Sequence, residues 1–75
     1  MTSVDELVKS GEKYLSDGKF FEALNCFEKS LIYDPNKPDL LNLKAVALRS
    51  LGRYDEASEC YNRSLELDPR DKASS

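Results

Sequence analysis

Residues 18–23 read Gly-Lys-Phe-Phe-Glu-Ala, and residues 52–57 read Gly-Arg-Tyr-Asp-Glu-Ala, so the same order of residue types returns after 34 positions. In each copy a glycine and a basic residue precede an aromatic residue, and a Glu-Ala pair closes the stretch. Glycine readily adopts the left-handed conformation that ends many helices, because it has no Cβ. The two stretches therefore predict two equivalent turns between helices, one in each half of the chain.

The period of 34 residues extends well beyond these two stretches. Self-similarity at such a period is the signature of a repeat protein, so the chain is predicted to contain two repeat units. The units cover residues 4–37 and 38–71 and leave a short tail at 72–75, all within a single domain of residues 1–75. The identical residues at equivalent positions are Asp5 and Asp39, Leu7 and Leu41, Ser16 and Ser50, Gly18 and Gly52, Glu22 and Glu56, Ala23 and Ala57, Cys26 and Cys60, Ser30 and Ser64, Leu31 and Leu65, Asp34 and Asp68, and Pro35 and Pro69.

Each unit is predicted to form two antiparallel helices, which gives an all-α fold of four helices. In the first unit Leu7 and Gly11 belong to an apolar series at helical spacing that stops at Gly18. A second series follows and stops at Pro35, because proline cannot continue the hydrogen-bond ladder of a helix. The helices are expected between residues 3 and 18, 18 and 35, 38 and 52, and 52 and 69.

Small residues are predicted to let the two helices of each unit approach closely. Gly11 is expected to face Ala23, and Ala45 is expected to face Ala57 in the second unit. Such pairs would bring the helix axes near the lower end of the usual range of about 8–10 Å.

The composition argues against several classes of partner. With 33% charged and 40% hydrophobic residues, the chain is typical of a soluble helical domain rather than a disordered segment. Its 11 basic and 14 acidic residues give a formal net charge of −3 that both halves share, so no basic stripe is present for nucleic acid. No apolar run approaches membrane-spanning length and no signal stretch opens the chain, so we expect a cytoplasmic protein without a membrane partner.

The sequence offers no convincing catalytic, cofactor or metal site. It contains no histidine, so no serine or cysteine has the usual base beside it, and two thiols cannot complete a zinc site. Cys26 and Cys60 are expected to be semi-buried side chains that lie too far apart for a disulfide. Glu22 and Glu56 stand near predicted helix starts, where negative charge meets the helix dipole. We therefore expect no enzyme activity, no cofactor and no metal.

Together these features resemble the tetratricopeptide repeat over residues 4–71. The 34-residue unit of that family has a small residue in its first helix, here Gly11 and Ala45, and the glycine-containing run seen at 18–23 and 52–57. The resemblance implies antiparallel helix pairs stacked in a right-handed superhelix that binds a protein partner. The remaining family features are the closing Asp34-Pro35 and Asp68-Pro69, and the departures are Leu7 and Leu41 in place of tryptophan, Ser10 and Lys44 in place of an apolar residue, and Ser30 and Ser64 in place of alanine.

The resemblance also implies that the first helix of each unit lines a concave groove for a partner peptide or helix. One subclass of the family grips the C-terminal carboxylate of heat-shock chaperones with lysines and asparagines, but the corresponding positions here hold Val8, Glu12 and Leu43. A chaperone carboxylate clamp is therefore not expected. The predicted partner-binding residues are Val8, Lys9, Glu12, Leu15, Asn42, Leu43, Val46 and Arg49, and the same face would hold Asp5, Ser16, Asp39 and Ser50.

The alternative function is structural: a self-associating scaffold unit or a fragment of a longer repeat array. Repeat proteins bury a continuous core only between neighbouring units, so the outward face of the second unit is expected to leave an apolar patch. A two-fold homodimer would cover that patch on both copies. The predicted self-association surface consists of Leu48, Leu51, Tyr61, Leu65 and Leu67.

Overall fold

The computed structural model describes residues 4–67, which form four α-helices joined by three short turns, with no strand among them. The predicted all-α helical repeat fold is confirmed. The predicted tail at 72–75, the helix stop at Pro69 and the Asp68-Pro69 pair lie outside the described residues. The helices are α1 (Val4–Ser16), α2 (Phe20–Tyr33), α3 (Pro38–Ser50) and α4 (Tyr54–Leu67).

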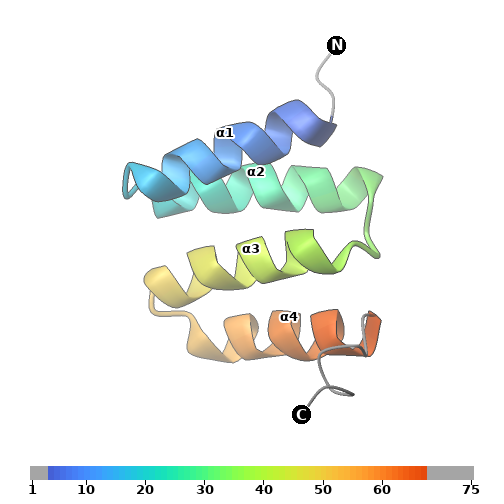
Figure 1. The fold of residues 1–75 in the computed structure, drawn as a ribbon. Helices are drawn as coiled ribbons and strands as arrows, with labels where there is room; N and C mark the ends of the chain where they lie inside the picture. Colours follow the sequence, from blue (N-terminus) through green and yellow to red (C-terminus); the bar gives the residue numbers. More distant parts are fainter. Residues whose placement is uncertain (1–3, 68–75) are drawn as a thin grey trace.

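The helices form two antiparallel hairpins, α1–α2 and α3–α4, that stack in sequence order (Figure 1). Each helix packs against the next one along the chain, and α2 and α3 form the contact between the hairpins. Helix α1 also touches α3, although much less extensively than it touches α2. The two hairpins therefore place their first helices, α1 and α3, next to each other on one side of the stack.

Both predicted glycine stops adopt the left-handed conformation, with φ of 78° at Gly18 and 82° at Gly52. In the first hairpin the Gly18 N–H donates to the carbonyl of Leu15 (3.1 Å), and the Lys19 N–H donates to the carbonyl of Tyr14 (2.8 Å). These two bonds satisfy carbonyls that the end of α1 would otherwise leave unpaired. The second hairpin repeats both bonds, from Gly52 to Arg49 (3.0 Å) and from Arg53 to Leu48 (2.9 Å).

The close approach of α1 and α2 depends on Gly11, and the ring of Phe27 is its nearest neighbour on α2. A Cβ at Gly11 would lie 2.5 Å from Cε1 of Phe27, and its three nearest atoms all belong to that ring. Phe27 is fully buried, so the ring has little freedom to move away. The missing side chain of Gly11 thus makes room for an aromatic ring of α2.

One apolar cluster joins the two hairpins. Its buried members come from α2, α3 and α4, and Tyr14, Leu15, Leu43, Leu51 and Tyr61 pack against it while remaining partly exposed. Burial of such side chains is the main favourable term in folding. The buried members are Ala23, Leu24, Phe27, Ala45, Ala47, Leu48, Ala57 and Cys60.

The departures from the family pattern have local explanations in the structure. Ser30 and Ser64 are buried, and their hydroxyls donate to the carbonyls of Cys26 (2.8 Å) and Pro38 (3.4 Å) respectively. Buried polar groups with such partners are not left unsatisfied. Lys44 is only partly buried, and its ammonium group lies 3.8 Å from a carboxylate oxygen of Glu28 on α2, so its charge is partnered across the hairpin contact.

Candidate functional site

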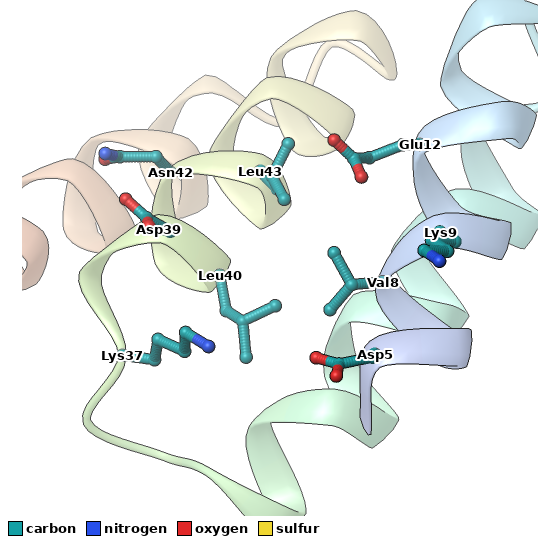
Figure 2. Close-up of a pocket in the computed structure, with 9 residues that line it drawn as sticks. All are labelled: Asp5, Val8, Lys9, Glu12, Lys37, Asp39, Leu40, Asn42 and Leu43. Atoms are coloured by element: carbon teal, nitrogen blue, oxygen red, sulfur yellow. The ribbon is translucent and has the colours of Figure 1, made fainter. Parts of the chain in front are cut away.

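A groove of about 580 Å³ lies between α1 and α3, on the side of the stack where the two first helices meet (Figure 2). Lys37, from the loop between α2 and α3, lines one end of it. Helices α1 and α3 touch only slightly, which leaves the groove between them. The residues that line the groove are Asp5, Val8, Lys9, Glu12, Lys37, Asp39, Leu40, Asn42 and Leu43.

Three apolar side chains form the floor of the groove. Val8 points from α1 toward α3, and Leu40 and Leu43 point from α3 toward α1 (Figure 2). Leu40 is 1% exposed and anchors this floor, whereas Val8 and Leu43 remain partly exposed. The floor therefore still presents apolar surface that a bound side chain could remove from water.

Charged side chains surround that floor. The carboxylates of Asp5 and Glu12 point toward α3 from either side of Val8, and Lys37 extends from the α2–α3 loop into the end where Asp5 lies (Figure 2). None of the charged groove residues forms an ion pair within residues 4–67. The ion pairs found in that range, Lys44 with Glu28 and Arg53 with Glu56, lie outside the groove. The groove thus offers charge of both signs that has no ion-pair partner among the described residues 4–67.

The structure brings part of the predicted partner-binding set together. Leu15, Val46 and Arg49, which sit further along α1 and α3, do not line the groove. Leu15 instead packs against the apolar cluster, and Arg49 is exposed in the last turn of α3. The predicted residues that do line the groove are Val8, Lys9, Glu12, Asn42 and Leu43.

The sequence interpretation missed Lys37 and Leu40. Lys37 precedes Pro38, and a residue before proline is held in extended backbone, here with φ −100° and ψ 110°. The position of Lys37 directly before a proline was therefore a usable sequence signal that Lys37 lies outside the helix. Leu40 has Glu6 as its equivalent one period earlier, so the repeat pattern itself concealed the apolar role of this position.

The predicted self-association surface needs one correction. Leu48 is 2% exposed, because it lies in the apolar cluster between the hairpins, and it cannot contribute to an outward patch. Leu51, Tyr61 and Leu65 are partly buried, and Leu67 is 38% exposed.

The described residues carry little further chemistry. Residues 4–67 contain no group of three or more potential metal-ligating side chains, and no helix in that range is long and apolar enough to cross a membrane. Cys26 and Cys60 are free thiols. Burial raises the pKa of the Cys60 thiol above its ordinary value of 9.0, and the positive charge of Lys44 offsets part of that rise.

Comparison with known proteins places the sequence. The family model described as the tetratricopeptide repeat matches residues 38–71, and the four helices of the structure form two helix-turn-helix hairpins. No curated protein matches the chain at a significant level. Over residues 38–71 the chain therefore matches the tetratricopeptide repeat family, whose repeats generally mediate contacts between proteins and are typically non-enzymatic scaffolds.

Proposed function

We propose that the chain is one domain of two repeat units that holds a segment of a partner protein in the groove between α1 and α3. The observation that carries this proposal is the partly exposed apolar floor of Val8 and Leu43, surrounded by charged side chains without ion-pair partners in residues 4–67. An apolar centre with a polar rim is the usual composition of a recognition surface. The floor supplies affinity and the rim supplies orientation.

The test begins with a displayed library of random short peptides, selected on the full chain. The selected peptides are then titrated into the isotope-labelled chain, and amide chemical shifts report the bound surface. We expect the shifts to map to α1 and α3 around the groove. Shifts that map to α4 or to the outer face of α2 would contradict the groove as the binding surface.

A pair of matched variants separates the groove from the rest of the surface. Leu43→Ser removes apolar area from the floor, and we expect it to weaken binding about tenfold or more, since the lost contact corresponds to about 1.5–3 kcal/mol. Ile32→Ser makes a similar change on α2, where the side chain is 77% exposed and lies outside the groove, and we expect no effect on binding. Circular dichroism melts of both variants verify that the fold is retained.

A second candidate function is self-association through the open face of the second hairpin. The observation that favours it is that Leu51, Tyr61 and Leu65 are incompletely buried and Leu67 is exposed. Ser58 on α4 is polar and exposed, whereas Leu24, the equivalent residue of the first hairpin, is apolar and buried. We therefore expect a weak dimer, and light scattering across a concentration series tests it.

A further inference from the structure

We infer that the groove between α1 and α3 takes a segment that presents two side chains on one face: an apolar one, and a lysine or arginine about 6 Å away that pairs with Glu12. This inference rests on the proposed function, because it specifies the chemistry of the segment that the groove holds. It depends on the apolar floor, the position of Glu12, and the distribution of the lysines around the groove.

The apolar floor fixes where the first of the two side chains sits. Val8 on α1 faces Leu40 and Leu43 on α3 across the groove (Figure 2). Leu40 is already buried, so the surface that a ligand can cover belongs to Val8 and Leu43. Only an apolar side chain gains from covering it, because a polar one would lose its hydration without a partner.

Glu12 fixes where the cationic side chain sits. It follows Val8 by one helical turn, four residues or about 6 Å along α1, and its carboxylate points toward α3 beside Leu43 (Figure 2). The side chain is exposed and forms no ion pair within residues 4–67. A cation that binds here therefore has no internal ion pair to displace.

The lysines exclude the same arrangement at the other end of the groove. There Lys37 extends toward Asp5, so a second cation would meet a positive charge as well as a carboxylate (Figure 2). Lys9 neighbours Val8 in sequence but does not point toward α3 (Figure 2). The third groove carboxylate, Asp39, points away from α1 (Figure 2). Of the two carboxylates that point from α1 toward α3, Glu12 is thus the one that no lysine faces, and the cationic side chain of the partner belongs at its end.

The required spacing is easily met by a partner segment. An extended chain places alternate side chains on one face, about 6.6 Å apart, and a helix places residues one turn apart at about 6 Å. An apolar residue with a basic residue two positions away in an extended segment, or four positions away in a helix, therefore matches Val8 and Glu12. The net charge of −3 also favours encounter with a cationic segment.

The experiment uses the full chain, isotope-labelled, and three capped synthetic peptides. Each peptide carries one leucine in a background of alanine and serine, and the residue two positions after the leucine is arginine, glutamine or glutamate. We expect the arginine peptide to bind most tightly, about threefold better than the glutamine peptide, which is the contribution of one exposed ion pair. The glutamate peptide should bind most weakly, and added salt should reduce the differences among the three.

Two variants with the same change in net charge complete the test. Glu12→Gln should bind the arginine and glutamine peptides equally, whereas Glu66→Gln, on the exposed end of α4, should discriminate as the unmodified chain does. Equal binding of all three peptides by the unmodified chain, or no detectable binding of any, overturns the inference. Preserved discrimination in Glu12→Gln also overturns it, yet the proposal that the groove binds a partner survives if Leu43→Ser weakens the binding of library-selected peptides as expected.

Discussion

Replacement of Gly52 by valine tests the link between the repeated glycines and the fold. Gly52 ends α3 with φ of 82°, a region that residues with a Cβ enter only at a cost. A Cβ built at this position meets no atom within 4 Å, so the cost is conformational and not steric. For an ordinary L-residue it is about 1–2 kcal/mol, and a β-branched side chain lies at or above the upper end of that range.

From these values we expect Gly52→Val to lower the free energy of unfolding by about 2 kcal/mol. For a domain of this size each kcal/mol shifts the melting temperature by about 4–8 °C, so the expected loss is about 8–16 °C. Thermal and urea melts followed by circular dichroism measure it. Gly52→Ala should cost less, because its strain is smaller and alanine also reduces the entropy of the unfolded chain.

Chemical synthesis of the chain provides a control of opposite handedness. D-Alanine prefers positive φ, so D-alanine in place of Gly52 should leave the melting temperature unchanged or raise it. Equal destabilisation by valine and D-alanine would mean that the site lacks space, contrary to the open surroundings of Gly52. No loss with valine would mean that α3 does not end in a left-handed residue, and the repeat interpretation of residues 52–57 would fail.

Four further predictions concern the core, the thiol and the open face. Gly11→Ala should lower the free energy of unfolding by about 1 kcal/mol, because overpacking against the ring of Phe27 exceeds the gain in helix propensity. In a double-mutant cycle of urea melts, Phe27→Leu should recover part of that loss. Ala57→Leu should cost about 1–3 kcal/mol in the same assay, because Ala57 is buried in the apolar cluster, and an unchanged midpoint would contradict that burial. Burial raises the pKa of Cys60, so the folded state binds more protons than the unfolded state above about pH 9. The free energy of unfolding should therefore fall as pH rises through that range, and it should fall less in Cys60→Ala. For self-association, light scattering should give a mass above 8.5 kDa at high concentration, with a concentration-dependent melt, and Leu67→Glu should restore the monomer mass.

The repeat pattern predicts the helices and their turns because those depend on local chemistry. Gly18 and Gly52 are the residues that can take positive φ at the ends of α1 and α3, so their position in the sequence determines where those helices stop. Pro38 likewise stands at the start of α3, where its missing N–H does no harm. Local signals of this kind do not depend on how the hairpins pack, so the helix stops and the helix start predicted from them agree with the structure.

Packing between hairpins is where the sequence interpretation was less accurate. The sequence interpretation assigned one apolar face to each helix, which suits a helix that packs against one neighbour. Helix α3 packs against both α2 and α4 and buries residues around much of its circumference. Leu48 was therefore expected at the surface and lies instead in the core. Leu40 escaped notice for the same reason, since the angle between hairpins, which the sequence does not encode locally, decides which side of α3 faces α1.

The burial of equivalent positions in the two hairpins explains why the two repeat units differ in sequence. Equivalent positions of the two hairpins have the same local structure, so a residue that is buried in one hairpin and exposed in the other owes its burial to the contact between hairpins. Leu24 is buried whereas its equivalent Ser58 is exposed, and Leu40 is buried whereas its equivalent Glu6 is exposed. The chain is thus apolar where the hairpins meet and polar at the equivalent positions on the outer faces. Such polar positions weaken any head-to-tail contact between copies, because stacking would bury them without partners.

In the groove, by contrast, the partly exposed Val8 and Leu43 lie beside charges without ion-pair partners in residues 4–67. We therefore expect the main contact with another protein in the groove rather than at the ends of the stack.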